Sequence, residues 1–147
     1  MNINLLAIGK RMPAWVHAGT TEYLRRMPRD YAVHLIEIPS VTHNNKKESA
    51  ALFEKCNPEK PIIALDRLGK TLDTRQLSLI LNEYHDTSLD IQLLIGGPEG
   101  IHEDYLKKAD QLWSLSALTL PHPLVRILLC EQLYRAWTLL TGHPYHK

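Results

Sequence analysis

Runs of apolar residues along the chain are separated by stretches in which apolar residues recur at helical spacing. Continuous apolar runs are typical of strands that a parallel sheet buries on both faces, and the segment PIIALD is the clearest example. The runs predict strands at Asn2 to Ile8, Val33 to Ile38, Pro61 to Asp66, Ile91 to Ile95 and Leu112 to Leu118.

Between these runs, apolar side chains return every three or four positions, as they do on one face of a helix. Asp73 followed by Gln76 has the spacing of a capping box. The predicted helices are at 13–27, 44–56, 73–84, 101–110 and Pro123 to Leu140. Strands and helices that alternate throughout predict an α/β fold, with a mainly parallel sheet and helices on both faces. No linker or repeat interrupts the pattern, so we expect one domain over residues 1–147.

Ligands of such sheets bind beyond the carboxyl ends of the strands. Those ends are Gly9, Leu65–Asp66, Gly96–Gly97 and Leu118–Thr119. We therefore expect the functional site among these positions.

The segment LLIGGPEG, residues 93–100, places two glycines at a strand end, where backbone can approach a ligand closely. It lacks the G-x-G-x-x-G pattern of dinucleotide sites, and no Gly-Lys-Ser/Thr follows as in a phosphate loop. A tight turn without a ligand would need the same glycines, so both interpretations stay open here.

The segment SLSALTLPHP, residues 114–123, interleaves hydroxyl groups with leucines and contains no lysine or arginine. Backbone polar groups in an apolar wall suit a purine ring and a thioether better than a triphosphate. The alternative is an ordinary connection between a strand and a helix.

The last predicted helix, PLVRILLCEQLYRAWTLL, carries apolar residues on nearly every side. One face can cover the sheet, and another needs a partner, so we predict a homodimer with this helix at its centre. Glu131, Arg135 and Thr138 share one stripe of the helix, where the first two can pair. This stripe is either a surface ion pair or a functional stripe at the subunit boundary.

Composition narrows the class of protein. The 147 residues are 44% hydrophobic and 22% charged, as in ordinary soluble proteins. The two cysteines lack the spacing of a zinc site, which suits a reducing cytosol. We find no signal peptide and no apolar stretch long enough to span a membrane, so we expect a cytoplasmic protein without a membrane or metal partner.

Charge alone says little, because the formal net charge is only +1. The first 31 residues and the last helix with its tail are each locally basic, and Arg126 and Arg135 belong to the second group. If the two ends meet, they could form a patch that holds phosphates. Scattered arginines on solvated helices would give the same count. The tail HPYHK adds aromatic and imidazole groups without the carboxylates that would support a metal site.

LLIGGPEG, SLSALTLPHPLVRILLCEQLYRAW and the final PYHK together closely resemble the bacterial ribosomal RNA large-subunit methyltransferase H family, of the SPOUT class. The resemblance covers the whole chain and is weakest between Ser40 and Lys60. It implies a SPOUT fold with a deep trefoil knot in its C-terminal part, and S-adenosylmethionine as the cofactor. The cofactor-binding residues that it implies are Leu65, Gly96, Leu115, Ser116, Ala117, Leu118, Thr119 and Leu120.

The resemblance also implies the reaction, methylation of N3 of a pseudouridine in 23S ribosomal RNA, on assembled ribosomes. The N3 proton must leave, and a nearby base or cation would assist. The groups that could do so are His122, Glu131, Arg135, Tyr145, His146 and Lys147. We favour Arg135, Tyr145 and His146 as catalytic residues that position the RNA or move the proton.

Two other functions stay open at this point. One is a non-catalytic RNA- or ribosome-binding factor with a vestigial cofactor pocket. The other is a nucleotide-binding enzyme of flavodoxin-like architecture, which would need a phosphate cradle that the sequence does not contain.

Overall fold

The predicted strands form one sheet in which all neighbouring strands are parallel, as the computed structural model of residues 1–147 shows. The order across the sheet is β2-β1-β4-β3-β5. The strands are β1 (Asn2–Ile8), β2 (Ala32–Ile38), β3 (Ile62–Thr71), β4 (Ile91–Ile95) and β5 (Gln111–Ser114). The predicted α/β fold with a parallel sheet is therefore confirmed.

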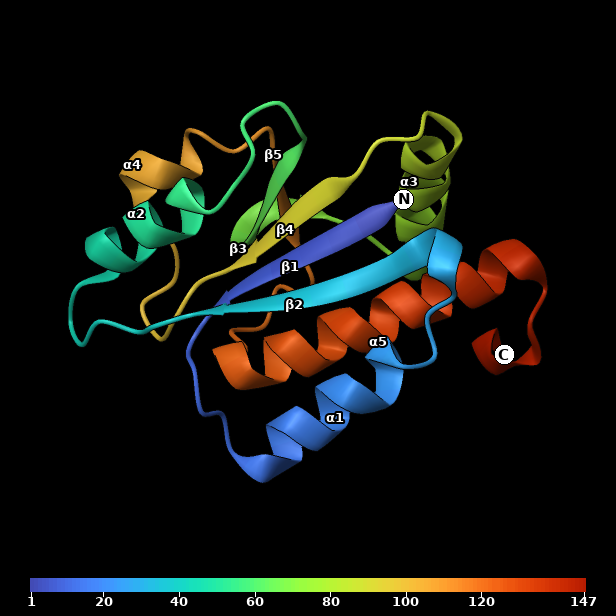
Figure 1. Cartoon of the computed structure of the whole chain (residues 1–147), viewed down its shortest axis with the longest axis horizontal. Helices are drawn as coiled ribbons and strands as arrows, with labels where there is room; N and C mark the ends of the chain where they lie inside the picture. The colour runs from blue at the N-terminus through green and yellow to red at the C-terminus, as the bar shows by residue number, and fades with distance from the viewer.

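Helices cover both faces of this sheet, with α2 and α4 on one side and α1 and α5 on the other (Figure 1). The α-helices are α1 (Ala14–Leu24), α2 (Asn45–Glu54), α3 (Thr74–Asp86), α4 (Glu103–Leu106) and α5 (His122–Thr141). Two short 3-10 helices, η1 (Arg29–Tyr31) and η2 (Pro144–His146), precede β2 and end the chain. No helix is long and apolar enough to cross a membrane.

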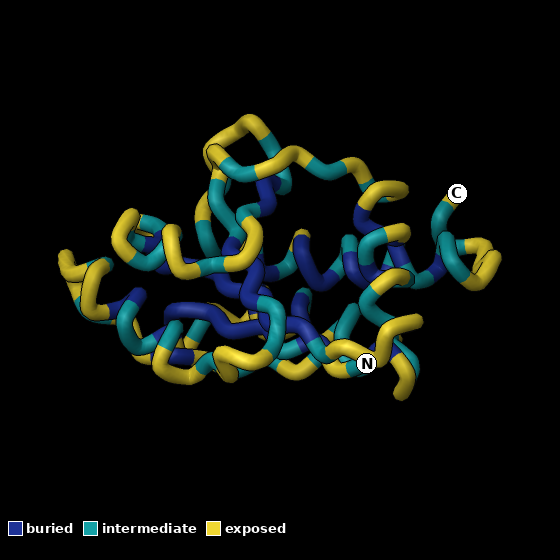
Figure 2. Tube along the Cα trace, turned by 90° about the horizontal axis from the view of Figure 1, so that it is seen from above, coloured by how far each residue is buried: buried dark blue, intermediate teal, exposed yellow.

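The sheet separates two hydrophobic cores. The larger one joins alternate residues of the strands, such as Leu5 and Leu93, to α3 and α5 through residues that include Leu81 and Leu133. The smaller one packs the opposite face against α2, through Leu52, and against the segment before α4, through Ile101. The central strands are accordingly almost wholly buried, and the outer loops are exposed (Figure 2).

Two strand predictions need correction. β3 runs past Asp66 to Thr71 through an irregularity, so that Trp113 of β5 pairs with both Leu65 and Lys70. Gly69 permits this close approach, because a Cβ atom there would lie 2.6 Å from the backbone of Leu112. β5 ends at Ser114 rather than Leu118.

Hydroxyl groups explain the early end of β5. The Ser114 hydroxyl donates to the carbonyl of Ser116 at 2.9 Å, and the Ser116 hydroxyl accepts from the amide of Leu118 at 2.9 Å. Such local bonds give the backbone an alternative to the sheet. Residues 115–121 therefore form a loop between β5 and α5.

The capping box that the sequence predicts at the start of α3 is present. Asp73 accepts from the amide of Gln76 at 2.7 Å, and Gln76 accepts from the amide of Asp73 at 2.8 Å. At its end, α5 stops at Gly142, whose φ of 71° lies in the left-handed region that favours glycine. That stop turns the tail back toward the helix.

Candidate cofactor and substrate site

A cavity of about 290 Å³ lies beyond the carboxyl ends of the central strands, between the glycine loop (residues 96–100) and the loop before α5. Seven of the eight residues predicted to bind the cofactor line it: Leu65, Gly96, Leu115, Ser116, Leu118, Thr119 and Leu120. Three segments far apart in the sequence thus meet, as expected for a parallel sheet. Their role toward a ligand stays a prediction.

Two predicted positions do not line the cavity. Ala117 is exposed to solvent and is not among the residues that line the cavity. Gly9, the end of β1, is covered by Met12 and by the side chain of Arg126, whose guanidinium donates to the carbonyl of Gly9 at 3.1 Å. The site therefore lies among three of the four predicted strand ends and not at the fourth.

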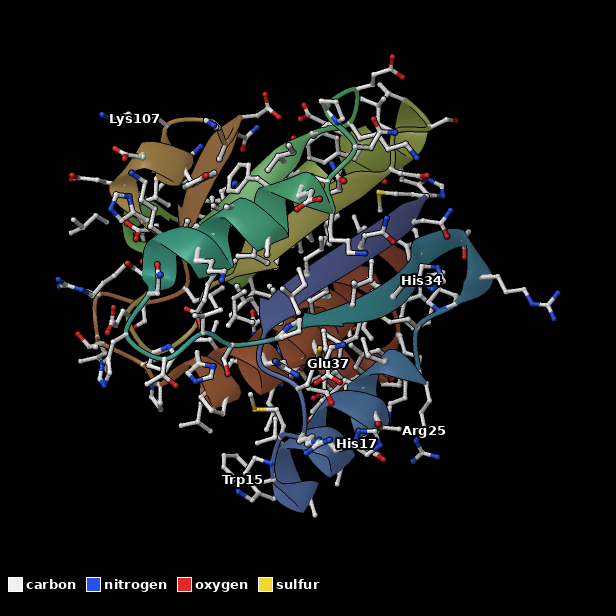
Figure 3. The ribbon with its side chains drawn as sticks, turned by 60° about the vertical axis from the view of Figure 1, so that its left-hand side comes forward. Trp15, His17, Arg25, His34, Glu37 and Lys107 are labelled. Carbon is white, nitrogen blue, oxygen red and sulfur yellow. The ribbon has the colours of Figure 1, made fainter.

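Arg126 is not part of a basic surface patch, contrary to the expectation from the sequence. Its side chain is only 2% exposed and pairs with Glu37 of β2, a residue labelled in Figure 3. It also donates to the carbonyls of Ile8 and Gly9. A buried guanidinium needs such partners, and its function is to tie α5 to the end of β1.

The walls of the cavity combine leucine side chains with the hydroxyls of Ser114, Ser116 and Thr119. Arg67 is the only lysine or arginine among the lining residues. An apolar cavity with a few polar groups fits a purine and a thioether, and a triphosphate would need more positive charge. The flavodoxin-like alternative finds no support here.

The glycine loop closes on itself. The amide of Gly100 donates to the carbonyl of Gly97 at 2.9 Å. A Cβ atom on Gly96 would lie 2.7 Å from the carbonyl carbon of Gly100, and one on Gly97 would lie 2.9 Å from a carboxylate oxygen of Glu48. The two interpretations of this motif are thus compatible, because the glycines form a tight turn that is also a cavity wall.

His122, the first residue of α5, lines the same cavity. Its Nδ1 atom is buried and has no hydrogen-bond partner. Burial, and next the nearby charge of Arg126, lower the pKa of this imidazole. A neutral imidazole with a free ring nitrogen can accept or donate a hydrogen bond to a ligand, depending on its tautomer.

The three predicted catalytic residues gather at the opposite end of α5. Arg135 donates through Nε to Glu131 at 2.8 Å, and the Tyr145 hydroxyl donates to the same carboxylate oxygen at 2.9 Å. The guanidinium of Arg135 lies over the Tyr145 ring, 4.8 Å from its centre. His146 follows in η2, with its Nδ1 atom buried and unpartnered. The predicted pair of Glu131 and Arg135 is confirmed.

Burial and the bond to Glu131 raise the pKa of Tyr145 to about 12. Its hydroxyl therefore stays protonated at neutral pH and is a donor, not a base. Thr138, the third member of the predicted stripe, is fully buried and donates to the carbonyl of Arg135 at 2.6 Å. Glu131 and Arg135 are partly buried, so the part of the stripe that reaches the surface consists of these two residues alone.

The tail lies far from the cavity of its own chain. The chain enters α5 beside the strand ends and reaches the tail at the other end of the helix (Figure 1). Because a helix rises about 1.5 Å per residue, His122 and Arg135 are about 20 Å apart along α5. Within one chain, the predicted catalytic residues of the tail therefore lie away from the cavity.

Aromatic rings surround the tail. Tyr134 packs against Tyr145 with ring centres 4.7 Å apart, and against Tyr23 of α1 at 6.3 Å. The guanidinium of Arg26 lies 5.6 Å from the ring centres of both Tyr23 and Tyr134. The two ends of the chain thus do meet, and they form an aromatic and cationic cluster. No group of three or more His, Cys, Asp or Glu side chains could hold a metal ion.

Sequence reasoning missed several lining residues, among them Arg67, Trp113 and Val125. Arg67 lies in the part of β3 beyond the predicted end of the strand at Asp66, and Trp113 lies within the predicted strand Leu112 to Leu118, where no role at the site is predicted. The spacing of Val125 after His122, one turn along a helix that begins at the loop, is a signal that could have found it.

Comparison with known proteins agrees with this geometry. A family model described as "Predicted SPOUT methyltransferase" matches residues 1–146. Two solved structures share the fold at low identity: a methylase family protein from Neisseria gonorrhoeae (TM-score 0.55, 11% identity, 90% of this chain and 81% of that one) and a methyltransferase from Bordetella pertussis Tohama I (TM-score 0.60, 16% identity, 91% and 95%). The family model, with which the fold agrees, thus shows a methyltransferase of the SPOUT class, and membership implies a methyl donor.

Curated relatives identify the family within the SPOUT class. Proteins named ribosomal RNA large subunit methyltransferase H from Azotobacter vinelandii and Coxiella burnetii are each 46% identical to this chain, and the one from Pseudomonas putida is 44% identical. Each match covers 100% of both sequences. The chain belongs to the ribosomal RNA large subunit methyltransferase H family of SPOUT methyltransferases.

Proposed function

We propose that this protein transfers a methyl group from S-adenosylmethionine to ribosomal RNA of the large subunit, at N3 of a pseudouridine in 23S RNA on assembled ribosomes. The observation that carries the proposal is the cavity at the strand ends, where Leu65, Gly96 and the loop 115–120 meet. The names of the curated relatives support the RNA substrate.

The residues present fit the proposed donor. The leucine walls suit an adenine ring and a thioether chain, and the loop hydroxyls and backbone can bind ribose and amino acid groups. When bound, S-adenosylmethionine supplies an electrophilic methyl group. The protein then has to align the acceptor nitrogen with that methyl group and exclude water.

Arg135, Tyr145 and His146 would serve the RNA side of the reaction. A guanidinium over a phenol ring offers a stacking surface and a positive charge, which suit a splayed-out base and its phosphate. The Tyr145 hydroxyl is held by Glu131 and stays protonated, so it would donate a hydrogen bond to the base. Arg135 would stabilise negative charge as N3 loses its proton.

Arg135, Tyr145 and His146 lie too far from the cavity of their own chain, so they can act only at the cavity of a second chain. We therefore propose a homodimer in which the tail of one protomer acts at the cavity of its partner. Unpaired apolar side chains near the start of α5 support this arrangement: Leu118 is 72% exposed, Leu124 39% and Leu128 40%. Trp15, 55% exposed, projects from the start of α1, which runs beside α5 (Figure 3). Sedimentation that gives a 16.9 kDa monomer at micromolar concentration would refute the dimer.

The C-terminal trefoil knot of the SPOUT class belongs to the same proposal. The order of the sheet supports it, because the last strand lies outside β3 and the chain then returns to α5 beside β1 and β4. The knot would pass the chain after β5 through a loop, and would hold loop 115–121 firmly against the glycine loop.

Calorimetric titration with S-adenosylmethionine is the first test. Binding is expected, and its absence would favour a non-catalytic RNA-binding factor with a vestigial pocket. The second test is mass spectrometry of 23S RNA from cells that lack the gene. The expected result is a pseudouridine without its N3 methyl group, restored by the wild-type gene.

A mixing experiment tests the shared site. One protein carries Gly96→Val and the other lacks residues 145–147, so that neither homodimer contains an intact site. Mixed dimers should regain one intact site each, about a quarter of the wild-type activity after random exchange of subunits. No recovery, with exchange verified by mass spectrometry, would mean that each chain uses its own tail.

A further inference from the structure

Glu48 is a buried carboxylate directly behind the cavity wall. Its residue is only 4% exposed, in the first turn of α2. One oxygen, Oε2, accepts from the amide of Val41 at 2.8 Å. The other, Oε1, accepts no hydrogen bond from the protein, keeps some contact with solvent, and would lie 2.9 Å from a Cβ atom on Gly97. Gly97 in turn lines the cavity.

No basic side chain pairs with this carboxylate. A buried carboxylate that accepts a single hydrogen bond is costly to keep charged. The bond from Val41 alone does not require a charge, because a neutral glutamine could accept it equally well. Because Gly97 has no side chain, only one backbone unit separates Oε1 from the cavity. The negative charge of Glu48 therefore acts on whatever occupies the cavity.

The surroundings of Glu48 fix its place relative to the glycine loop. Asn45 donates to the carbonyl of Glu99 at 3.4 Å, and Ser49 accepts from the amide of His102 at 2.9 Å. Two side chains of α2 thus hold the glycine loop and the residues that follow it from behind. This gives a role to the segment between Ser40 and Lys60, in which no motif is apparent from the sequence.

We propose that Glu48 is a specificity-determining residue, whose charge makes the cavity prefer a cationic sulfonium donor over the neutral thioether product. This inference rests on the proposed function. S-Adenosylmethionine carries one more positive charge than S-adenosylhomocysteine and otherwise differs from it by the methyl group. Other carboxylates near the cavity, Asp66 and Glu99, are more exposed and are screened by solvent. Glu48 is buried and is screened least.

Glu48→Gln separates the two roles of the side chain, since the amide oxygen can still accept from Val41 while the charge is lost. Unit charges about 10 Å apart at an effective dielectric constant of about 20 interact strongly enough to change affinity about tenfold. The variant should bind S-adenosylmethionine about tenfold more weakly and S-adenosylhomocysteine as the wild type does. Glu48→Asp keeps the charge and should restore the preference for the donor.

The experiment is calorimetric titration of both ligands into the wild type, the two Glu48 variants and Glu54→Gln. Glu54 is an exposed carboxylate at the other end of α2, so the control changes the net charge equally without touching the loop. Failure of the wild type to bind either ligand would refute the proposed function itself. If the wild type binds, a Glu48→Gln protein that binds both ligands normally, or loses both equally, overturns the role of Glu48.

Discussion

The two ends of α5 present different kinds of site. At its start, the cavity is built from backbone, glycines, leucines and short hydroxyl side chains, and its shape comes from loops that close on one another. At its end, Glu131 holds a guanidinium and a phenol in place through charged and hydrogen-bonded side chains. The first is suited to enclosing a small molecule, and the second to contacting a large polar one.

Under the proposed function, this difference assigns donor binding to the start of α5 and acceptor binding to its end. A substitution at the start of α5 should affect the methyl donor, and one at its end should affect methyl transfer to RNA without affecting the donor. About 20 Å of helix keeps the two apart in one chain, so under the proposed function a catalytic unit would combine two chains. The predictions that follow test this separation, beginning with the largest effect.

The substitution Gly96→Val should disrupt the cavity at the strand ends. A side chain at this position meets the backbone of Gly100 and Ile101 at 2.7 and 2.8 Å, so the glycine loop has to open. Strain of this kind should weaken binding of S-adenosylmethionine by at least about a hundredfold. Calorimetry measures the affinity, and circular dichroism verifies the fold.

The matched control for that variant is Ala117→Val. Ala117 is exposed and is the one predicted contact residue whose position does not line the cavity. Its affinity should stay close to that of the wild type. Normal binding by Gly96→Val would place the donor elsewhere.

Deletion of residues 145–147 should leave donor affinity unchanged and reduce methyl transfer to ribosomes by about a hundredfold, the cost of losing a positioning group. The removed residues contact α5 far from the cavity, which supports intact donor binding. Titration and radiolabelled methyl transfer on the same protein measure both quantities. Unimpaired transfer would show that the tail has no role, and loss of both activities would make it part of the fold.

Glu131→Ala should have a smaller effect of the same type. It removes the acceptor shared by Arg135 and Tyr145, so both side chains lose their fixed orientation. Transfer should fall about tenfold, as expected for loss of a charge-assisted hydrogen bond. Glu83→Ala, at an exposed carboxylate of α3, is the control. Equal activities of the two variants would contradict a positioning role for Glu131.

The smallest expected effect is the dependence of stability on pH through His122. Its pKa in the folded protein lies below the ordinary value of 6.5. As pH falls below 6.5, the unfolded chain binds a proton at this site before the folded protein does, so the free energy of unfolding decreases. In His122→Gln this decrease should be shallower. Urea unfolding at several pH values measures the free energy of unfolding. If it falls with pH equally in both proteins, the lowered pKa of His122 is contradicted.

Most of the fold could be predicted from the sequence because its central strands are buried on both faces and apolar residues recur at helical spacing between them. PIIALD and IQLLI predict central strands for this reason, and both are central. The extension of β3 past Asp66 could not be predicted, because it depends on Gly69 and on a neighbour, β5, that is distant in sequence. Residues 115–118 resemble a strand, but local hydroxyl bonds make them a loop.

The sequence by itself determined the parallel α/β fold, the family and the segments that form the cavity, because these follow from local pattern and from motifs. Only the tertiary structure decided the partners of the charged side chains. It buries Arg126 against Glu37, places Glu48 behind Gly97 and puts the tail at the opposite end of α5 from the cavity. The physical reason is that pairing and burial of a charge depend on distances between segments far apart in the chain, which local patterns do not encode.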